Sequence, residues 1–117
     1  MKSFHDLKVW EKAHLLVLTI YKVTQRFPND EKFSLISQVR RSAISIPANI
    51  VEGFKRKSDK DFSHFLNIAE GSSEETKYYL ILSKDLRYIA SENYEVLIRQ
   101  SEEVGRMLQG LIKKLNS

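Results

Sequence analysis

The chain has 117 residues, and we expect residues 1–117 to form one domain around one hydrophobic core. It contains no cysteine, which excludes disulfides and thiolate metal sites. No apolar run approaches the length of a membrane span, and the N-terminus lacks the apolar stretch of a signal peptide. Because the chain has no cysteine, the expected location is the cytoplasm. The net charge of +4 permits an anionic partner without requiring one.

A first helix is predicted from about His5 to Arg26, because apolar residues recur there every three to four positions. Its core face carries Leu7, Trp10, Ala13, Val17, Ile20, Tyr21 and Thr24. Leu16, Val23 and Phe27 extend the apolar surface well round the side, and such a helix needs more cover than one bundle provides. Pro28 ends the helix, since a residue before proline is disfavoured in the helical conformation.

A second helix is predicted from about Asp30 to Arg56. Its apolar arc carries Ile36, Val39, Ala43, Ile46, Pro47, Ile50, Val51 and Phe54. Pro47 lacks a backbone donor and is expected to bend or locally break the helix. Arg40 points into the same arc, where an unpaired guanidinium would be costly, so we expect a carboxylate partner on another helix. Gly53 is expected to loosen the last turn.

Ser58 is the predicted N-cap of a third helix that continues to about Ile89. The middle of its core face is small, at Gly71-Ser72-Ser73, and this favours close approach of a neighbouring helix over a phosphate-binding loop, which needs exposed amides at a helix start. A fourth amphipathic helix follows the turn at Ala90–Asn93 and runs to about Leu115. Four long helices with short connections predict an all-α, antiparallel up-down-up-down four-helix bundle.

Two stretches carry a resemblance to a known family. Residues 38–53 read QVRRSAISIPANIVEG, and residues 61–75 read DFSHFLNIAEGSSEE. Both resemble motifs of a bacterial four-helix bundle family that includes the proteins encoded in 23S rRNA intervening sequences. The accessory variability protein of diversity-generating retroelements is a related member. The similarity runs from about Phe4 to Leu115, with mild departures: Val51 and Ser83 stand where alanine is usual, and Arg87 where glycine commonly precedes Tyr88.

The resemblance implies a four-helix bundle that assembles as a ring-shaped homo-oligomer, usually a pentamer, with a basic surface and no known catalytic residues. It also suggests the partner of Arg40, because Glu75 occupies the last position of the second motif. We therefore expect a buried Arg40–Glu75 ion pair between the second and third helices. For the oligomer interface we expect apolar residues beyond the core stripes: Leu16, Val23, Phe27, Tyr78, Ile81 and Leu82.

One pattern is typical of an enzyme. Glu11 and His14, and Asp61 and His64, form two carboxylate-x-x-His units of the kind that di-iron bundles use. The fourth helix offers no carboxylate at the same level, so we expect neither a metal site nor a cofactor. No arrangement of histidine, serine and acid suggests a nucleophile with its base, and we expect no small-molecule substrate.

Charge is distributed unevenly along the predicted bundle. An up-down topology brings the start of the first helix, the turn between the second and third, and the end of the fourth to one end. That end collects nine lysines and arginines against five acids, whereas the remaining charges balance. We call it the basic end. The candidate nucleic-acid-binding residues are Lys8, Lys12, Lys55, Arg56, Lys57, Lys60, Lys113 and Lys114.

Two functions remain open. The first is an oligomer that binds RNA or DNA through phosphate contacts at the basic end, with little sequence preference, because we expect no aromatic platform there and assign Phe54 and Phe62 to the core. The alternative is a scaffold that binds another protein, since the related retroelement protein is thought to work beside a reverse transcriptase. A lysine-rich end that is merely solvated would also fit the charge pattern.

Overall fold

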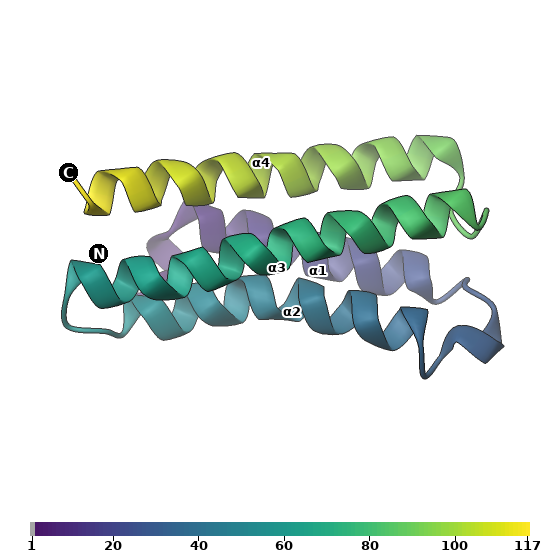
Figure 1. The fold of residues 1–117 in the computed structure, drawn as a ribbon, viewed down its shortest axis with the longest axis horizontal. Coiled ribbons are helices and arrows are strands. Elements are labelled where there is room, and N and C mark those ends of the chain that lie inside the picture. The colour runs from purple at the N-terminus through teal and green to yellow at the C-terminus, as the bar shows by residue number, and fades with distance from the viewer. Residues whose placement is uncertain (1) are drawn as a thin grey trace.

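The computed structural model describes residues 2–117. It contains four helices, α1 (Lys8–Thr24), α2 (Leu35–Phe54), α3 (Asp59–Asp85) and α4 (Ser91–Leu115), and two 3-10 turns, η1 (Phe4–Asp6) and η2 (Asn29–Glu31). These residues include no β-strand. Successive helices run antiparallel, so both termini lie at the same end as the α2–α3 turn (Figure 1). The prediction of an all-α four-helix bundle is confirmed.

The helices pack in a ring of neighbours. Each contacts the next along the chain, and α1 also contacts α4, whereas the diagonal pairs do not meet. The centre is filled by aliphatic side chains from all four helices, among them Leu16, Ile20, Val39, Ile46, Ile50, Leu66, Leu80, Leu97, Val104 and Leu108. No helix within residues 2–117 combines the length and apolar character needed to cross a membrane.

The helix starts follow local hydrogen bonding. Ser3 and Asp6 form a capping box over η1, and Ser58 accepts a hydrogen bond from the Asp61 amide, which confirms Ser58 as the N-cap of α3. The second helix begins at Leu35 rather than near Asp30, because the chain after Pro28 makes the separate turn η2 first. The hydroxyl of Ser34, the residue just before α2, donates to the carboxylate of Glu31 in this turn.

Helix α3 ends earlier than expected, at Asp85 rather than Ile89. Arg87 adopts a φ of 65°, and the amides of Arg87 and Tyr88 donate to the carbonyls of Lys84 and Ser83, each at 2.9 Å. These two bonds form a Schellman motif, in which the residue with positive φ is usually glycine. The left-handed conformation of Arg87 therefore terminates the helix.

Helix α2 runs through Pro47 without interruption. The expected local break is therefore absent, and Pro47 is buried on the core side. The small middle of α3 allows α2 to approach closely, as predicted: the hydroxyls of Ser42 and Thr76 lie 2.8 Å apart, and those of Ser45 and Ser72 lie 2.8 Å apart. Gly53 is buried against Phe62 and Phe65 near the end of α2, which stops at Phe54 rather than near Arg56.

The expected Arg40–Glu75 ion pair is wrong. Arg40 is half-buried, and its guanidinium donates to the Thr24 hydroxyl at 2.9 Å and to the Tyr21 carbonyl at 3.3 Å. It also lies 4.3 Å from the centre of the Tyr21 ring, a cation–π distance. Glu75 is exposed on α3. The guanidinium is therefore satisfied by α1, through a hydroxyl, a carbonyl and a ring, and needs no carboxylate.

The expected oligomer interface is corrected in part. Leu16 is fully buried and Phe27 is 7% exposed, so both belong to the core of this chain and are not free to meet another subunit. Val23 and Leu82 are half-buried and pack against the same core. Tyr78 and Ile81, in contrast, are 57% and 41% exposed on α3. Only these two of the six offer substantial free apolar surface.

Candidate nucleic-acid interface

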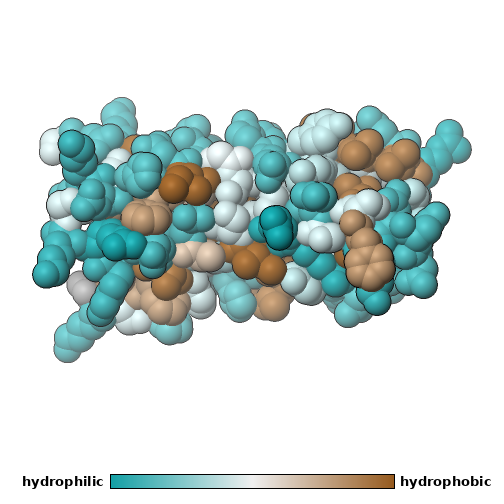
Figure 2. Space-filling model, turned by 60° about the horizontal axis from the view of Figure 1, so that its bottom comes forward, coloured by the Kyte–Doolittle hydropathy of each residue, from teal (hydrophilic) through white to brown (hydrophobic). Residues whose placement is uncertain are grey.

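The basic end joins three parts of the chain. The α2–α3 turn supplies Lys55, Arg56, Lys57 and Lys60, the end of α4 supplies Lys113 and Lys114, and the start of α1 supplies Lys8 and Lys12. Figure 1 shows the α2–α3 turn and the end of α4 at the end where both termini lie, with the start of α1 set back from them in the same half of the bundle. Hydrophilic side chains project from this end of the bundle in Figure 2. The topology thus brings together the segments on which the predicted charge cluster depends.

Two of the eight predicted residues already have acidic partners. The Arg56 guanidinium lies 2.6 Å from the Glu52 carboxylate and stacks over the Phe65 ring at 4.7 Å. The Lys12 ammonium lies 3.7 Å from the Glu103 carboxylate on α4, and Lys12 is half-buried. These contacts indicate structural roles for Arg56 and Lys12.

The other six predicted residues are exposed: Lys8, Lys55, Lys57, Lys60, Lys113 and Lys114. None of them takes part in the three ion pairs found in residues 2–117. Lys113 and Lys114 occupy the last turn of α4, where positive charge also interacts favourably with the helix dipole. Lysines without partners can exchange bound water for phosphate oxygens, so these six form the part of the basic end that is open to an anion.

Four aromatic rings cluster at the η1 turn and the start of α1, the helix that also carries Lys8. Trp10 stacks on His14, with ring centres 5.2 Å apart and planes inclined by 6°. Phe4 and His5 stack on one another at 4.2 Å and both meet Trp10 edge-on at 5.0 Å. We call these four residues the ring cluster. The i, i+4 spacing of Trp10 and His14 in the sequence indicates that their rings can stack on one helix face. Phe4 and His5 reach the ring cluster only because the η1 turn brings them there.

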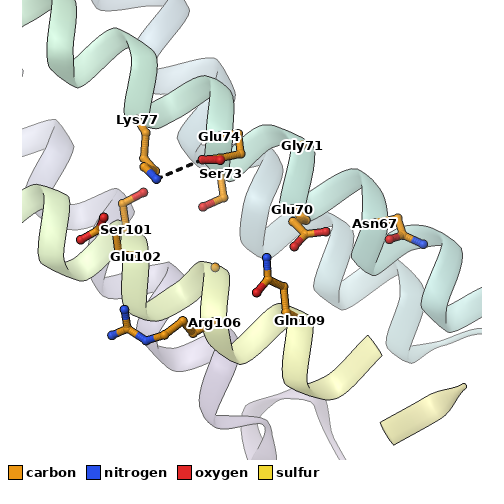
Figure 3. A pocket seen from close by; sticks show the side chains of 11 residues that line it. Asn67, Glu70, Gly71, Ser73, Glu74, Lys77, Ser101, Glu102, Arg106 and Gln109 are labelled. Carbon is orange, nitrogen blue, oxygen red and sulfur yellow. Dashed lines mark ion pairs between the residues drawn. The ribbon is translucent and has the colours of Figure 1, made fainter. Parts of the chain in front are cut away.

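A groove lies between α3 and α4. Figure 3 shows this groove of about 550 Å³, with a Glu74–Lys77 ion pair of 3.2 Å on the α3 side and Glu102 and Arg106 on α4. Gly71 and Gly105 also line it, and apart from the adjacent backbone of its own helix no described residue stands within 4 Å of where a Cβ on either would lie. Acids and bases are mixed along its walls, so the groove does not favour an anion as the basic end does.

Each of the three histidines contacts an aromatic ring. His14 lies on Trp10, and His64 meets the Phe65 ring edge-on at 5.5 Å. No group of three or more potential ligands that could hold a metal occurs in the part of the chain from Lys2 onward. The two carboxylate-x-x-His units therefore do not converge with further ligands.

The opposite end of the bundle is closed by a hydrogen bond between distant segments. The Tyr88 hydroxyl donates to the Glu31 carboxylate at 2.9 Å, and the Tyr88 ring packs against Phe27. Hydrogen bonds from Ser34 and then from Tyr88 lower the pKa of the Glu31 carboxyl, and the bond to Glu31 raises the pKa of the Tyr88 hydroxyl. This contact holds the α3–α4 connection on η2, so that end is occupied by structural interactions.

Comparison with known proteins gives two findings. The family of 23S rRNA-intervening sequence proteins matches residues 5–110. A crystal structure described as a protein with unknown function from the S23 ribosomal protein family, from Bacteroides thetaiotaomicron VPI-5482, is similar with a TM-score of 0.83 and 35% sequence identity. The match covers 90% of this chain and 95% of that one. No curated protein matches the chain.

The family match extends over nearly all of α1 to α4, and the similar structure has the same fold at substantial sequence identity. Both agree with the motifs in residues 38–53 and 61–75, which lie on α2 and α3 where those helices pack together. The chain belongs to the 23S rRNA-intervening sequence protein family.

Proposed function

We propose that this chain is a non-enzymatic, homo-oligomeric protein of the cytoplasm that binds nucleic acid through phosphate contacts at its basic end. The observation that carries the proposal is the group of six exposed lysines outside the ion pairs, gathered from three segments at one end. Lysine is a flexible point charge that contacts phosphates without reading base edges. Binding through these residues depends strongly on salt and little on sequence.

The experiment measures binding of a duplex and a single-stranded oligonucleotide by the wild type and by two matched triple variants. Reversal of Lys55, Lys57 and Lys60 to glutamate removes most of the binding. The slope of log affinity against log salt concentration falls by about 0.9 for each duplex phosphate that the variant no longer neutralises. Arg56 is left in place because of its bond to Glu52. This variant and the control variant described next both stay folded, because exposed charges contribute little to stability.

The control reverses Lys22, Arg26 and Lys32 to glutamate. These three residues are also exposed, and the change in net charge is the same, but they belong to the opposite end. The control keeps most of its affinity at moderate salt. Equal loss in both variants means that only net charge matters. Absence of wild-type binding at low salt favours the scaffold function, in which a protein such as a reverse transcriptase is the partner.

Self-association is the second part of the proposal. Tyr78 and Ile81 stand one turn apart on the outer face of α3 and are both exposed. The family suggests a ring of five subunits, and parallel subunits would multiply the charge of the basic end. A Tyr78→Lys, Ile81→Lys variant dissociates in sedimentation velocity, whereas Val96→Lys, which changes an exposed apolar residue on α4, does not. A wild type that sediments as a monomer at micromolar concentration contradicts self-association.

A further inference from the structure

The ring cluster borders a hollow of about 340 Å³ between α1 and α2. Phe4, Trp10 and His14 line one side of this hollow, and Pro47 and Val51 of α2 lie on the other. The lining is mainly apolar, and the volume falls within the range of roughly 300–1,000 Å³ typical of small-ligand sites. The hollow therefore offers flat aromatic and aliphatic surfaces to a planar group.

Lys55 lies beyond this hollow on the same face of α2. Pro47, Val51 and Lys55 are spaced four residues apart, so each stands about one helical turn past the last on a common face. Lys55 is the C-cap residue of α2, is exposed and belongs to the basic end. A chain of phosphates held at that lysine can thus place an attached base against the ring cluster.

We propose that the ring cluster is a stacking platform for unpaired bases, so that the ligand of the basic end is single-stranded nucleic acid. This inference rests on the function proposed above and names its ligand. Stacking on aromatic side chains contributes roughly 1–3 kcal/mol per base in other single-strand-binding proteins and tolerates any sequence. A duplex keeps its bases stacked inside and gains only the phosphate contacts.

The outer members of the cluster favour a base over a second copy of the chain. His5 and His14 are exposed, and the one ring that His14 meets among residues 2–117 is Trp10. An apolar protein surface that covered the hollow would desolvate the His14 imidazole, which lines it, without replacing the hydrogen bonds of that imidazole to water, and this is unfavourable. A base can stack on an imidazole face and also offers polar atoms at its edge.

The test uses Trp10 as the reporter, because it is the single tryptophan of the chain. The full-length protein is titrated at one salt concentration with a single-stranded RNA of about 12 nucleotides, the length scale of known single-strand sites. The same titration is made with the duplex and with an abasic strand of equal phosphate number. The RNA strand quenches Trp10 emission and binds roughly tenfold more tightly than the abasic strand, as expected for about 1.4 kcal/mol of stacking.

His14→Ala is the informative variant, because His14 is exposed and alanine suits a helix. It lowers affinity for the single strand by roughly tenfold and leaves affinity for the abasic strand unchanged. His64→Ala, an exposed histidine near the start of α3 outside the ring cluster, changes neither. A merely structural role of the cluster would alter stability without altering this preference.

Three results overturn the inference and are distinguishable. Equal binding of single and abasic strands without a change in Trp10 emission removes the platform but leaves the phosphate-binding function intact. Absence of binding by all three probes at low salt removes the proposed function as well. Trp10 emission that changes with protein concentration alone, and is not altered by RNA, shows that a second copy of the chain occupies the hollow.

Discussion

Helix α3 packs against α2 on one side and α4 on the other, and we call these two contact zones its seams. Small residues are closely packed in the first seam and border open space in the second. Against α2, each small residue has something to meet: Ser42 lies beside Thr76, Ser45 beside Ser72, and Gly53 against Phe62 and Phe65. Against α4, Gly71 and Gly105 border an open groove, and the fully buried Ser101 hydroxyl has no hydrogen-bond partner among residues 2–117. Residue type alone therefore does not reveal what a glycine or serine does within a helix.

The first seam is a close-packed contact and the second is a partly open one. A glycine stabilises a helix pair only where a Cβ would collide with the partner, and elsewhere it costs helix stability by roughly 1 kcal/mol relative to alanine. A buried hydroxyl likewise contributes only where it finds a partner. The same substitution made in the two seams should therefore change stability in opposite directions.

The largest effect is expected from Gly53→Ala. A Cβ at this position would lie 2.9 Å from Cδ1 of Phe62 and 2.9 Å from Cβ of Phe65, and 3.2 Å from the carbonyl oxygen of Phe62. The Phe62 ring can rotate, but the Cβ and the carbonyl belong to the rigid part of α3. Overpacking of this kind lowers the free energy of unfolding by about 1–3 kcal/mol, measured by urea denaturation. Unchanged or raised stability would show that the seam opens easily.

The second test makes one substitution in both seams. Ser42→Ala removes a hydroxyl that lies 2.8 Å from Thr76 and 3.1 Å from the Val39 carbonyl, and it lowers unfolding free energy by about 1 kcal/mol. Ser101→Ala removes a buried hydroxyl without a partner and raises unfolding free energy by up to about 1 kcal/mol. Thermal unfolding of both variants gives the comparison directly. Changes of the same sign would contradict the contrast between the two seams.

The fold was largely predictable, because periodicity and the Ser58 cap locate the helices and short connections require antiparallel neighbours. The contacts of single side chains were not. Periodicity shows that Leu16 is apolar, but it cannot show which of two apolar faces the same chain covers. Arg40 was assigned a carboxylate on α3 from the position of Glu75 in a motif, although a hydroxyl, a carbonyl and a ring on α1 satisfy it.

The basic end illustrates the same limit. Topology alone predicts which lysines belong to the basic end, because their placement along the bundle depends only on the direction of each helix. Which of them are free depends on partners that sequence does not fix, such as Glu103 for Lys12. The ring cluster was missed because two of its rings come from the η1 turn, where the prediction had placed the start of the first helix, at about His5. Short turns between helices are thus where sequence patterns are least informative.

Gly71→Ala and Gly105→Ala extend the comparison to the open seam. Within the part of the chain that the structure describes, neither new Cβ would have a neighbour within 4 Å beyond its own helix backbone, so alanine gains helix propensity without a clash. Each substitution raises the unfolding free energy by up to about 1 kcal/mol, and the two are expected to add because the residues stand on different helices. Denaturation of the single and double variants measures this. A loss of stability in either would show that something fills the groove in solution, such as another subunit.

The smallest effect is expected at Arg87, where the backbone requires what glycine provides. Its φ of 65° places a side chain in the left-handed region, which costs roughly 1–2 kcal/mol for a residue with a Cβ. Arg87→Gly relieves this cost but gives glycine more freedom in the unfolded chain, so the net gain is about 0.5–1 kcal/mol. Arg87→Ala is the control, because it removes the charge and keeps the strain, and it should leave the melting temperature nearly unchanged. If alanine stabilises as much as glycine does, the gain comes from the removed charge and not from the backbone. If glycine alone stabilises, glycine at residue 87 favours the fold for the opposite reason to Gly53: it relieves the conformation of its own backbone, whereas Gly53 makes room for the neighbouring helix.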